Sequence, residues 1–386
     1  MNDTFQLRIQ QLYQCLYAVI VFLSVLSLSS WNLYVPHLLN TSDRLMLLVF
    51  GATIFVTLLS EWSKKRLVAM FIFSLLIIGY YYLYKKSIFV FVLLAILAGS
   101  GMKFDKLLKT DLIARSISVI FIISLSLLKV LPSSGSGVSE TKFIYTKFTF
   151  GFTYPNILGY LLVIIIITYC FSISLLKKQV FWIVLLGCLI EYLLNYSTGL
   201  ISLILFFVLY IWIQRDTLQR SNILLLTSSL LIPVFTIISV WIAKYYFASN
   251  NWWDRVNTIL SLRPPIWQYY LKAMPISFFG NTKSINQYTL GVVGHGAFDG
   301  AYIQFLLEFG ILSILILFIA VFSLYCLHLP VHQKATLGTL IMVTCFSGFP
   351  ETNGFLVTFS PMFFLIGSAW FNTFQCENAH CINSSL

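Results

Sequence analysis

Two arginines and two proton acceptors lie between positions 255 and 299, and their chemistry suits a phosphorylated substrate. Arg255 and Arg263 each carry a guanidinium, which binds phosphate oxygens through two parallel hydrogen bonds where lysine offers a point charge. Either arginine alone could instead contact lipid head groups. His295 and Asp299 each carry a side chain that can accept a proton from a reacting hydroxyl. Together the four residues predict a site for a lipid-linked phosphate substrate.

The composition predicts that these residues belong to a membrane protein. Of the 386 residues, 59% are hydrophobic and only 10% are charged, whereas soluble domains carry roughly a quarter charged residues. Apolar runs of roughly 20 residues, enough to cross a bilayer as a helix, recur along the chain. A membrane barrel is excluded because its strands are short and alternate polar with apolar residues. The predicted fold class is therefore all-α, a polytopic integral membrane helical bundle.

We expect about twelve transmembrane helices in a single transmembrane domain that covers residues 1–386. The predicted spans are 12–31, 45–60, 67–84, 87–102, 112–131, 155–175, 179–196, 198–213, 222–243, 300–327, 335–349 and 355–374. With both termini in the cytoplasm, four basic clusters fall inside, as the positive-inside rule requires: Lys64–Arg66, Lys103–Lys109, Lys177–Lys178 and Arg215–Arg220. The net charge of +11 is thereby assigned largely to topology, and nucleic acid is not expected as a partner.

Two outer connections are longer than the others, residues 132–154 and a large extracytoplasmic loop of about sixty residues at 244–300. Pro264 and Pro265 fit only the first turn of a helix, and apolar residues follow at helical spacing from Trp267 to Met274. We expect a short amphipathic helix in this loop, lying on the outer leaflet of the membrane.

Two glutamates inside predicted spans differ in their expected roles, since ionisable side chains in spans are costly and are candidates for function. Glu191 lies about five residues from the outer end of its span, with Asn195 one turn later. The pair could polarise an outer cavity or join neighbouring helices through hydrogen bonds. Glu308 and Asp299 are nine positions apart, which puts them about 180° apart on a continuous helix. We therefore expect Asp299, which shares a face with Tyr302, at the site and a structural role for Glu308.

Three segments resemble motifs of the bacterial O-antigen ligase and polysaccharide polymerase family. The run FTYPNILG at 152–159 resembles the family's Pro-Asn element followed closely by Gly. Residues 263–280, from RPPIW to FFG, resemble its Arg, Trp and terminal Gly pattern in the large outer loop. DGAYI at 299–303 and LEFGI at 307–311 resemble its junction between that loop and the next span, although Gly300 stands where members often have Asn. The order and spacing of these segments, together with twelve spans and one dominant outer loop, extend the resemblance over most of the chain.

The resemblance implies a glycosyltransferase, a repeat-unit polymerase at the outer face of the bacterial cytoplasmic membrane. It would join undecaprenyl-diphosphate-linked oligosaccharides into capsule, exopolysaccharide or O-antigen, in contact with membrane lipid and beside a flippase and a chain-length regulator. Asp299 or His295 would be the base, while Arg255 and Arg263 would stabilise the diphosphate. The substrate-binding residues would be Tyr154, Asn156, Glu191, Trp267 and Tyr302. No cofactor and no metal are implied, since no carboxylate cluster with metal-ligand spacing is visible.

Other functions fit the same composition. A ligase would transfer the finished glycan to a terminal acceptor; the polymerase is favoured because the ligase is expected to have His at the junction, where Asp299 stands. A flippase or other transporter would also have about twelve spans, but transporters commonly consist of two repeated halves, and no such symmetry is visible. A non-catalytic scaffold would leave the outer polar residues unexplained.

Overall fold

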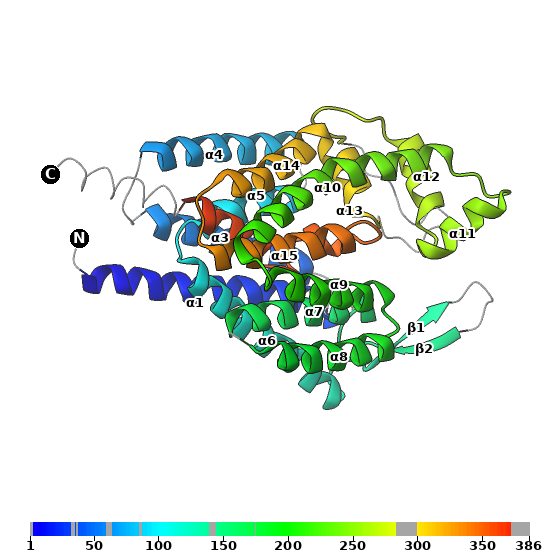
Figure 1. The fold of residues 1–386 in the computed structure, drawn as a ribbon, viewed down its shortest axis with the longest axis horizontal. Coiled ribbons are helices and arrows are strands. Elements are labelled where there is room, and N and C mark those ends of the chain that lie inside the picture. The colour runs from blue at the N-terminus through cyan, green and yellow to red at the C-terminus, as the bar shows by residue number, and fades with distance from the viewer. Residues whose placement is uncertain are drawn as a thin grey trace. The chain divides into compact units, whose positions relative to one another are not determined.

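The computed structural model describes residues 3–31, 35, 38–58, 64–84, 87–138, 144–173, 175–282 and 299–371. The chain is predominantly helical (Figure 1) and is divided into two compact units. Unit 1 consists of Met1–Phe73, Leu94–Arg215 and Val357–Leu386, and unit 2 consists of Ser74–Leu93 and Asp216–Leu356. The residues predicted for the site therefore fall into two groups, one in each unit.

The helices of unit 1 pack as two groups joined through α6. α1 packs on α3 and α6, α6 packs on α7, and α7, α8 and α9 pack on one another. The elements are α1 (Asp3–Ser27), α3 (Leu38–Leu58), the first part of α4 (Lys64–Tyr84), the end of α5 (Ser87–Gly99), α6 (Phe104–Leu127), α7 (Pro155–Ser172), α8 (Lys177–Leu193) and α9 (Ser197–Ile213). α7 begins where Pro155 occupies its first turn and the preceding residue, Tyr154, is extended.

Unit 2 is organised around the long helix α10 (Thr217–Tyr245), against which α12, α13, α14 and α15 pack. The other elements are α11 (Asn251–Ile259), α12 (Arg263–Ala273), α13 (Ala301–Gln304), η2 (Phe305–Phe309), α14 (Gly310–Cys326), α15 (Val331–Ser347) and η3 (Asn353–Phe355). Figure 1 shows α11 and α12 at the C-terminal end of α10, where the long connection between predicted spans begins.

Helices are found at all twelve predicted spans, and five of them are long and apolar enough to cross a membrane. These five are Leu7–Ser27, Phe104–Leu127, Pro155–Ser172, Thr217–Tyr245 and Ala301–Cys326. Shorter apolar helices are Met70–Tyr82, Ile88–Gly99, Ser197–Ile213 and Met362–Phe371. The apolar helices indicate a multi-pass membrane protein, whereas twelve crossings and their direction stay predictions.

The predicted all-α class is confirmed, and a short two-stranded hairpin accompanies the helices. β1 (Ser134–Val138) pairs antiparallel with β2 (Ile144–Phe148), in a register that sets Ser134 opposite Phe148 and Val138 opposite Ile144. The hairpin occupies the connection at 132–154 that was expected to be a loop. Its first strand, SGSGV, consists of Ser and Gly apart from Val138, so the sequence carries little signal for it.

An ion pair is buried inside unit 1, and the sequence reasoning did not single it out. Arg115 donates from Nη2 to Oδ1 of Asp111 over 2.7 Å and from Nε to Oδ2 over 3.0 Å. Tyr17 of α1 donates its hydroxyl to Asp111 over 2.8 Å, and Arg115 Nη1 donates to the Thr358 carbonyl over 3.0 Å. The signal was an Asp and an Arg four positions apart on one helix, the spacing of side chains that meet.

Candidate functional site

Arg263 is presented at the start of α12 by a tight turn after α11. Ser261 and Leu262 adopt left-handed backbone angles, with φ of 49° and 67°, and Leu262 is the N-cap of α12. Pro264 and Pro265 follow in the first turn, where their missing N–H groups cost no helical hydrogen bond. The predicted helix after the proline pair is therefore confirmed, and α11 before it was not predicted.

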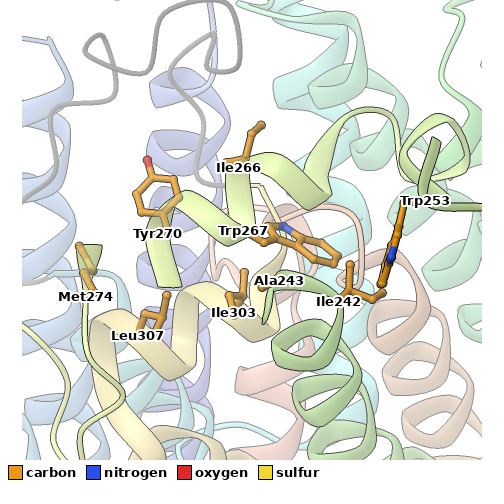
Figure 2. Close-up of a cluster of buried hydrophobic side chains, with 9 residues drawn as sticks. All are labelled: Ile242, Ala243, Trp253, Ile266, Trp267, Tyr270, Met274, Ile303 and Leu307. Atoms are coloured by element: carbon orange, nitrogen blue, oxygen red, sulfur yellow. The ribbon is translucent and has the colours of Figure 1, made fainter. Parts of the chain in front are cut away.

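The apolar face of α12 packs on protein rather than on the outer leaflet, which corrects the expectation from the sequence. Trp267 is 0% exposed, and Tyr270 and Met274 are each 1% exposed. Figure 2 shows these side chains in one cluster with residues from the end of α10 and from α13 and η2, including Ile303 and Leu307. The helical spacing was read correctly, but burial against the unit explains it.

Trp267 also fixes the backbone at Asp299. Its indole Nε1 donates to the Asp299 main-chain oxygen over 2.6 Å. Gly300 follows with φ of 99°, and a Cβ built on it would lie 2.6 Å from Trp267 Nε1. Glycine is therefore required at position 300, because the indole occupies the space of any side chain. The next residue, Ala301, donates its N–H to the carbonyls of Gly348 and Glu351.

The Arg263 guanidinium brings two carboxyl groups together. Its Nη2 lies 2.9 Å from Glu351 Oε1 and 3.3 Å from Asp299 Oδ2. Its Nε donates to the Pro350 carbonyl over 3.0 Å, and its Nη1 donates to the Ser261 carbonyl over 2.9 Å. The side chain of Asp299 is 24% exposed while that of Glu351 is 6% exposed. Glu351 is thus the tightly held partner, and Asp299 is the carboxyl that a substrate could reach.

Opposing effects act on the Asp299 carboxyl. Burial raises its pKa above the ordinary value because the charged form loses solvation, and the Arg263 guanidinium acts in the opposite direction. The burial effect is the larger, so Asp299 is a stronger proton acceptor than a solvated aspartate. This is the property that a general base at neutral pH requires.

Tyr270 lies within electrostatic reach of the same site. Burial raises the pKa of its phenol to about 12, and the negative charges of Glu308, Tyr269 and Asp299 act in the same direction. The phenol is therefore neutral at pH 7. Both Glu308 and Asp299 act on this one ring, although the helical phase predicted them on opposite faces.

The reason is that the helix carrying Glu308 is not continuous. α13 passes into the π-helical segment η2, and Gly310 then adopts a φ of 83° before α14 continues. Within the break, Gln304 Nε2 donates to Glu308 Oε2 over 3.1 Å. The calculation that put Asp299 and Glu308 about 180° apart assumed a regular helix, so its premise was wrong. The structural role expected for Glu308 therefore has no support from its angular position on the helix.

Two of the segments quoted for the family resemblance pack on each other at this break. Ile311 and Leu312 donate main-chain hydrogen bonds to the carbonyls of Ser277 and Phe278. Gly280, with φ of 95°, approaches the main chain of Glu308, and Gly310 approaches the main chain at Gly280. Neither glycine has space for a side chain. The end of the described loop is therefore attached to the start of the next predicted span.

Gly300→Ala is expected to lower the stability of unit 2 by about 1–3 kcal/mol, because a non-glycine residue is strained at positive φ and its Cβ meets the Trp267 indole. Gly79, on α4 in the same unit, is the matched control, since nothing lies within 4 Å of a Cβ built there. Alanine at Gly79 is expected to be neutral or stabilising by up to about 1 kcal/mol. Thermal unfolding of the purified variants measures both, and equal melting temperatures would contradict the packing described here.

The other residues predicted for the site are not all brought to this cluster. Tyr154, 60% exposed, and Asn156 lie at the start of α7, and Glu191 lies on α8, all in unit 1. Arg255 is exposed on α11 in unit 2. His295 lies outside the described residues. For these residues, contact with a substrate stays a prediction.

Two residues predicted to bind substrate have their polar atoms engaged by protein. Tyr302 is 1% exposed and donates its hydroxyl to the Cys345 carbonyl over 2.9 Å. Trp267 is 0% exposed and its N–H is taken by Asp299. In this conformation both hold the site together. Direct contact of either ring with a sugar stays a prediction.

Glu351 is the site residue that sequence reasoning missed. It lies between the predicted spans 335–349 and 355–374, in a short connection that the assigned topology puts on the same side as Asp299. An acidic residue in a short outer connection was therefore a visible signal. Nothing in the sequence, however, tells which of the outer charges meet, because residues 263 and 351 are joined only by tertiary packing.

No family model, no characterised protein and no solved structure matches this chain. The support for a function therefore comes from the geometry of the site and from the motif resemblance.

Proposed function

We propose that the chain is a glycosyltransferase of the bacterial cytoplasmic membrane that polymerises undecaprenyl-diphosphate-linked oligosaccharide units into a surface polysaccharide. The proposal includes about twelve spans, cytoplasmic termini and an outer loop at 244–300. One observation supports it most directly: Arg263 holds a partly exposed aspartate beside a buried glutamate at a helix start. This arrangement supplies a base whose position is fixed by a guanidinium, and Arg263 and Asp299 also belong to the segments that carry the motif resemblance.

The proposed reaction needs one group that accepts a proton and one that stabilises the departing diphosphate. Asp299 takes the proton from an acceptor hydroxyl as the hydroxyl oxygen forms a bond to the anomeric carbon of the donor sugar. The bond from that carbon to the diphosphate oxygen breaks, and undecaprenyl diphosphate leaves with the electron pair. The diphosphate is already a good leaving group, so cationic donors that neutralise its charge supply the remaining help.

The two arginines divide this work. The contacts of Arg263 with Ser261, Pro350 and Glu351 use three of the five N–H donors of a guanidinium, and a fourth faces Asp299. Too few remain for a bidentate bond to phosphate, so Arg263 acts as a positioning residue for the base. Arg255 is exposed on α11 and has its fork available to solvent, so we assign diphosphate binding to it.

The test is elongation by the purified full-length protein with lipid-diphosphate oligosaccharide as the only substrate. A polymerase is expected to produce a ladder of products that differ by one repeat unit. Products formed only after a distinct terminal acceptor is added would identify a ligase instead. Movement of the intact donor across vesicles with no new glycosidic bond would identify a flippase, and either result would overturn the polymerase.

The pH dependence of elongation separates the roles of the two arginines. Arg263→Ala removes the cation that lowers the pKa of Asp299, so this pKa rises further and the acid limb of the kcat/KM profile moves to higher pH. Lysine at position 263 is expected to move the limb part of the way back. Arg255→Ala is the comparison variant, with a raised KM for the donor and an unmoved acid limb. An unmoved limb in folded Arg263→Ala would remove Arg263 from the positioning role.

A further inference from the structure

An acidic residue that takes no part in the proposed reaction is buried in unit 1. Glu191 of α8 is 0% exposed. Among the described residues, neither of its carboxyl oxygens has a hydrogen-bond partner. A buried polar group without a partner is rare in proteins and calls for an explanation.

The space around the Glu191 carboxyl is created by two glycines on neighbouring helices. A Cβ built on Gly199 of α9 would lie 2.6 Å from Glu191 Oε2, and one built on Gly159 of α7 would also meet that oxygen. The ring of Tyr196 lies beside both glycine positions. The carboxyl is therefore enclosed by backbone and an aromatic ring, in a space that any other residue at 159 or 199 would fill.

The charges around this carboxyl decide its form. The titratable groups found near it are the Cys188 thiol, one turn earlier on α8, and the Tyr196 phenol. Gly159 of α7 and Gly199 of α9, which face the carboxyl from the neighbouring helices, have no titratable side chain. None of these is a cation. Gly159 and Gly199 lie near the helix starts, whose dipoles favour a carboxylate. That effect is smaller than the cost of burying an unpaired charge, so the neutral acid is favoured.

We propose that Glu191 is a proton-binding site inside the packed helices α7, α8 and α9, and that its carboxyl carries a proton at neutral pH. Since the glycine backbones cover the carboxyl, the proton can exchange only when α7 or α9 separates from α8. Protonation is thereby coupled to the packing of three helices. This inference does not depend on the proposed glycosyl transfer.

Asp111 provides an internal comparison within the same unit. It is also 0% exposed, but it is held by Arg115 and Tyr17. Burial is the same for the two carboxyls, and only the partners differ. Asp111 has a guanidinium beside its carboxyl, whereas Glu191 has no hydrogen-bond partner among the described residues.

The deciding measurement is the infrared difference spectrum between wild-type protein and Glu191→Gln in lipid at pH 7. A protonated carboxyl has a carbonyl stretching band at higher frequency than a carboxylate, and this band shifts in deuterated water. We expect the difference spectrum to contain the protonated band. A difference spectrum that contains only carboxylate bands would overturn the proposal.

A chemical readout on the full-length protein tests the same assignment. Dicyclohexylcarbodiimide, an apolar reagent, adds the O–H of a protonated carboxyl across one C=N bond, and the adduct rearranges to a stable N-acylurea without loss of atoms. Peptide mass mapping is expected to find the adduct on Glu191 and not on Asp111. Glutamine at 191 is isosteric with the neutral acid, so its melting temperature is expected to equal that of the wild type. A large drop in the melting temperature of this variant, or labelling of Asp111 in preference to Glu191, would contradict a neutral Glu191.

Discussion

Asp299→Asn is expected to reduce elongation by about 10²–10⁴-fold, the range typical of a lost general base. Asparagine has the size of aspartate but cannot accept the proton. The fold at this position should persist, because Trp267 binds the main-chain oxygen of residue 299 rather than its side chain. The rate of ladder formation with the lipid-diphosphate donor measures the loss.

Asp254→Asn is the matched control for this experiment. Asp254 is exposed on α11, and it belongs to the same loop and unit as Asp299. Elongation by the control is expected to stay near the wild-type rate. If folded Asp299→Asn also elongated at that rate, Asp299 would not be the base, and Glu351→Gln would be the next variant to measure.

Arg115→Ala is expected to destabilise the protein by about 3–5 kcal/mol, because removing one member of a buried ion pair leaves the other charge uncompensated. Asp111 would keep only its bond to Tyr17, and the Thr358 carbonyl would lose its donor. Replacing both Asp111 and Arg115 by leucine is expected to cost much less, since apolar residues of similar volume often substitute well for a buried pair.

Unfolding of purified protein in detergent measures these differences. Arg215→Ala is the control, as Arg215 is an exposed arginine in the same unit, and a change within about 0.5 kcal/mol is expected there. If Arg115→Ala were no less stable than the double leucine variant, the buried Asp111 carboxyl would not depend on Arg115 for the stability of the fold.

The positions of the helices could be predicted from the sequence better than the contacts between them. Apolar length predicted a helix at each span, and the proline pair at 264 and 265 predicted where α12 begins. The break between α13 and α14 was missed because Gln304 and Glu308, the polar residues of the stretch 303–309, are four positions apart, a spacing that a regular α-helix also allows. Periodicity alone cannot distinguish these two helix types over a single turn.

The same holds for the candidate site, where residue types could be predicted but contacts between distant segments could not. Arg263 and Asp299 were identified by residue type, and the structure brings them to 3.3 Å. Glu351 and the Trp267 hydrogen bond were not foreseen, because each depends on a contact between segments far apart in the chain. The role of Gly300 became clear only with the indole beside it, since a glycine in a sequence does not reveal what occupies the space it leaves.

The cluster of two carboxyls and one guanidinium has a consequence for substrate affinity. With Asp299 and Glu351 ionised beside Arg263, the three side chains sum to a net charge of −1 (+1 − 2). A diphosphate donor that approaches this cluster is repelled, and the repulsion falls if Asp299 takes up a proton. Acid should therefore raise the affinity for the donor and lower the catalytic turnover. Donor binding is linked to proton uptake by Asp299, while the chemical step requires Asp299 without its proton.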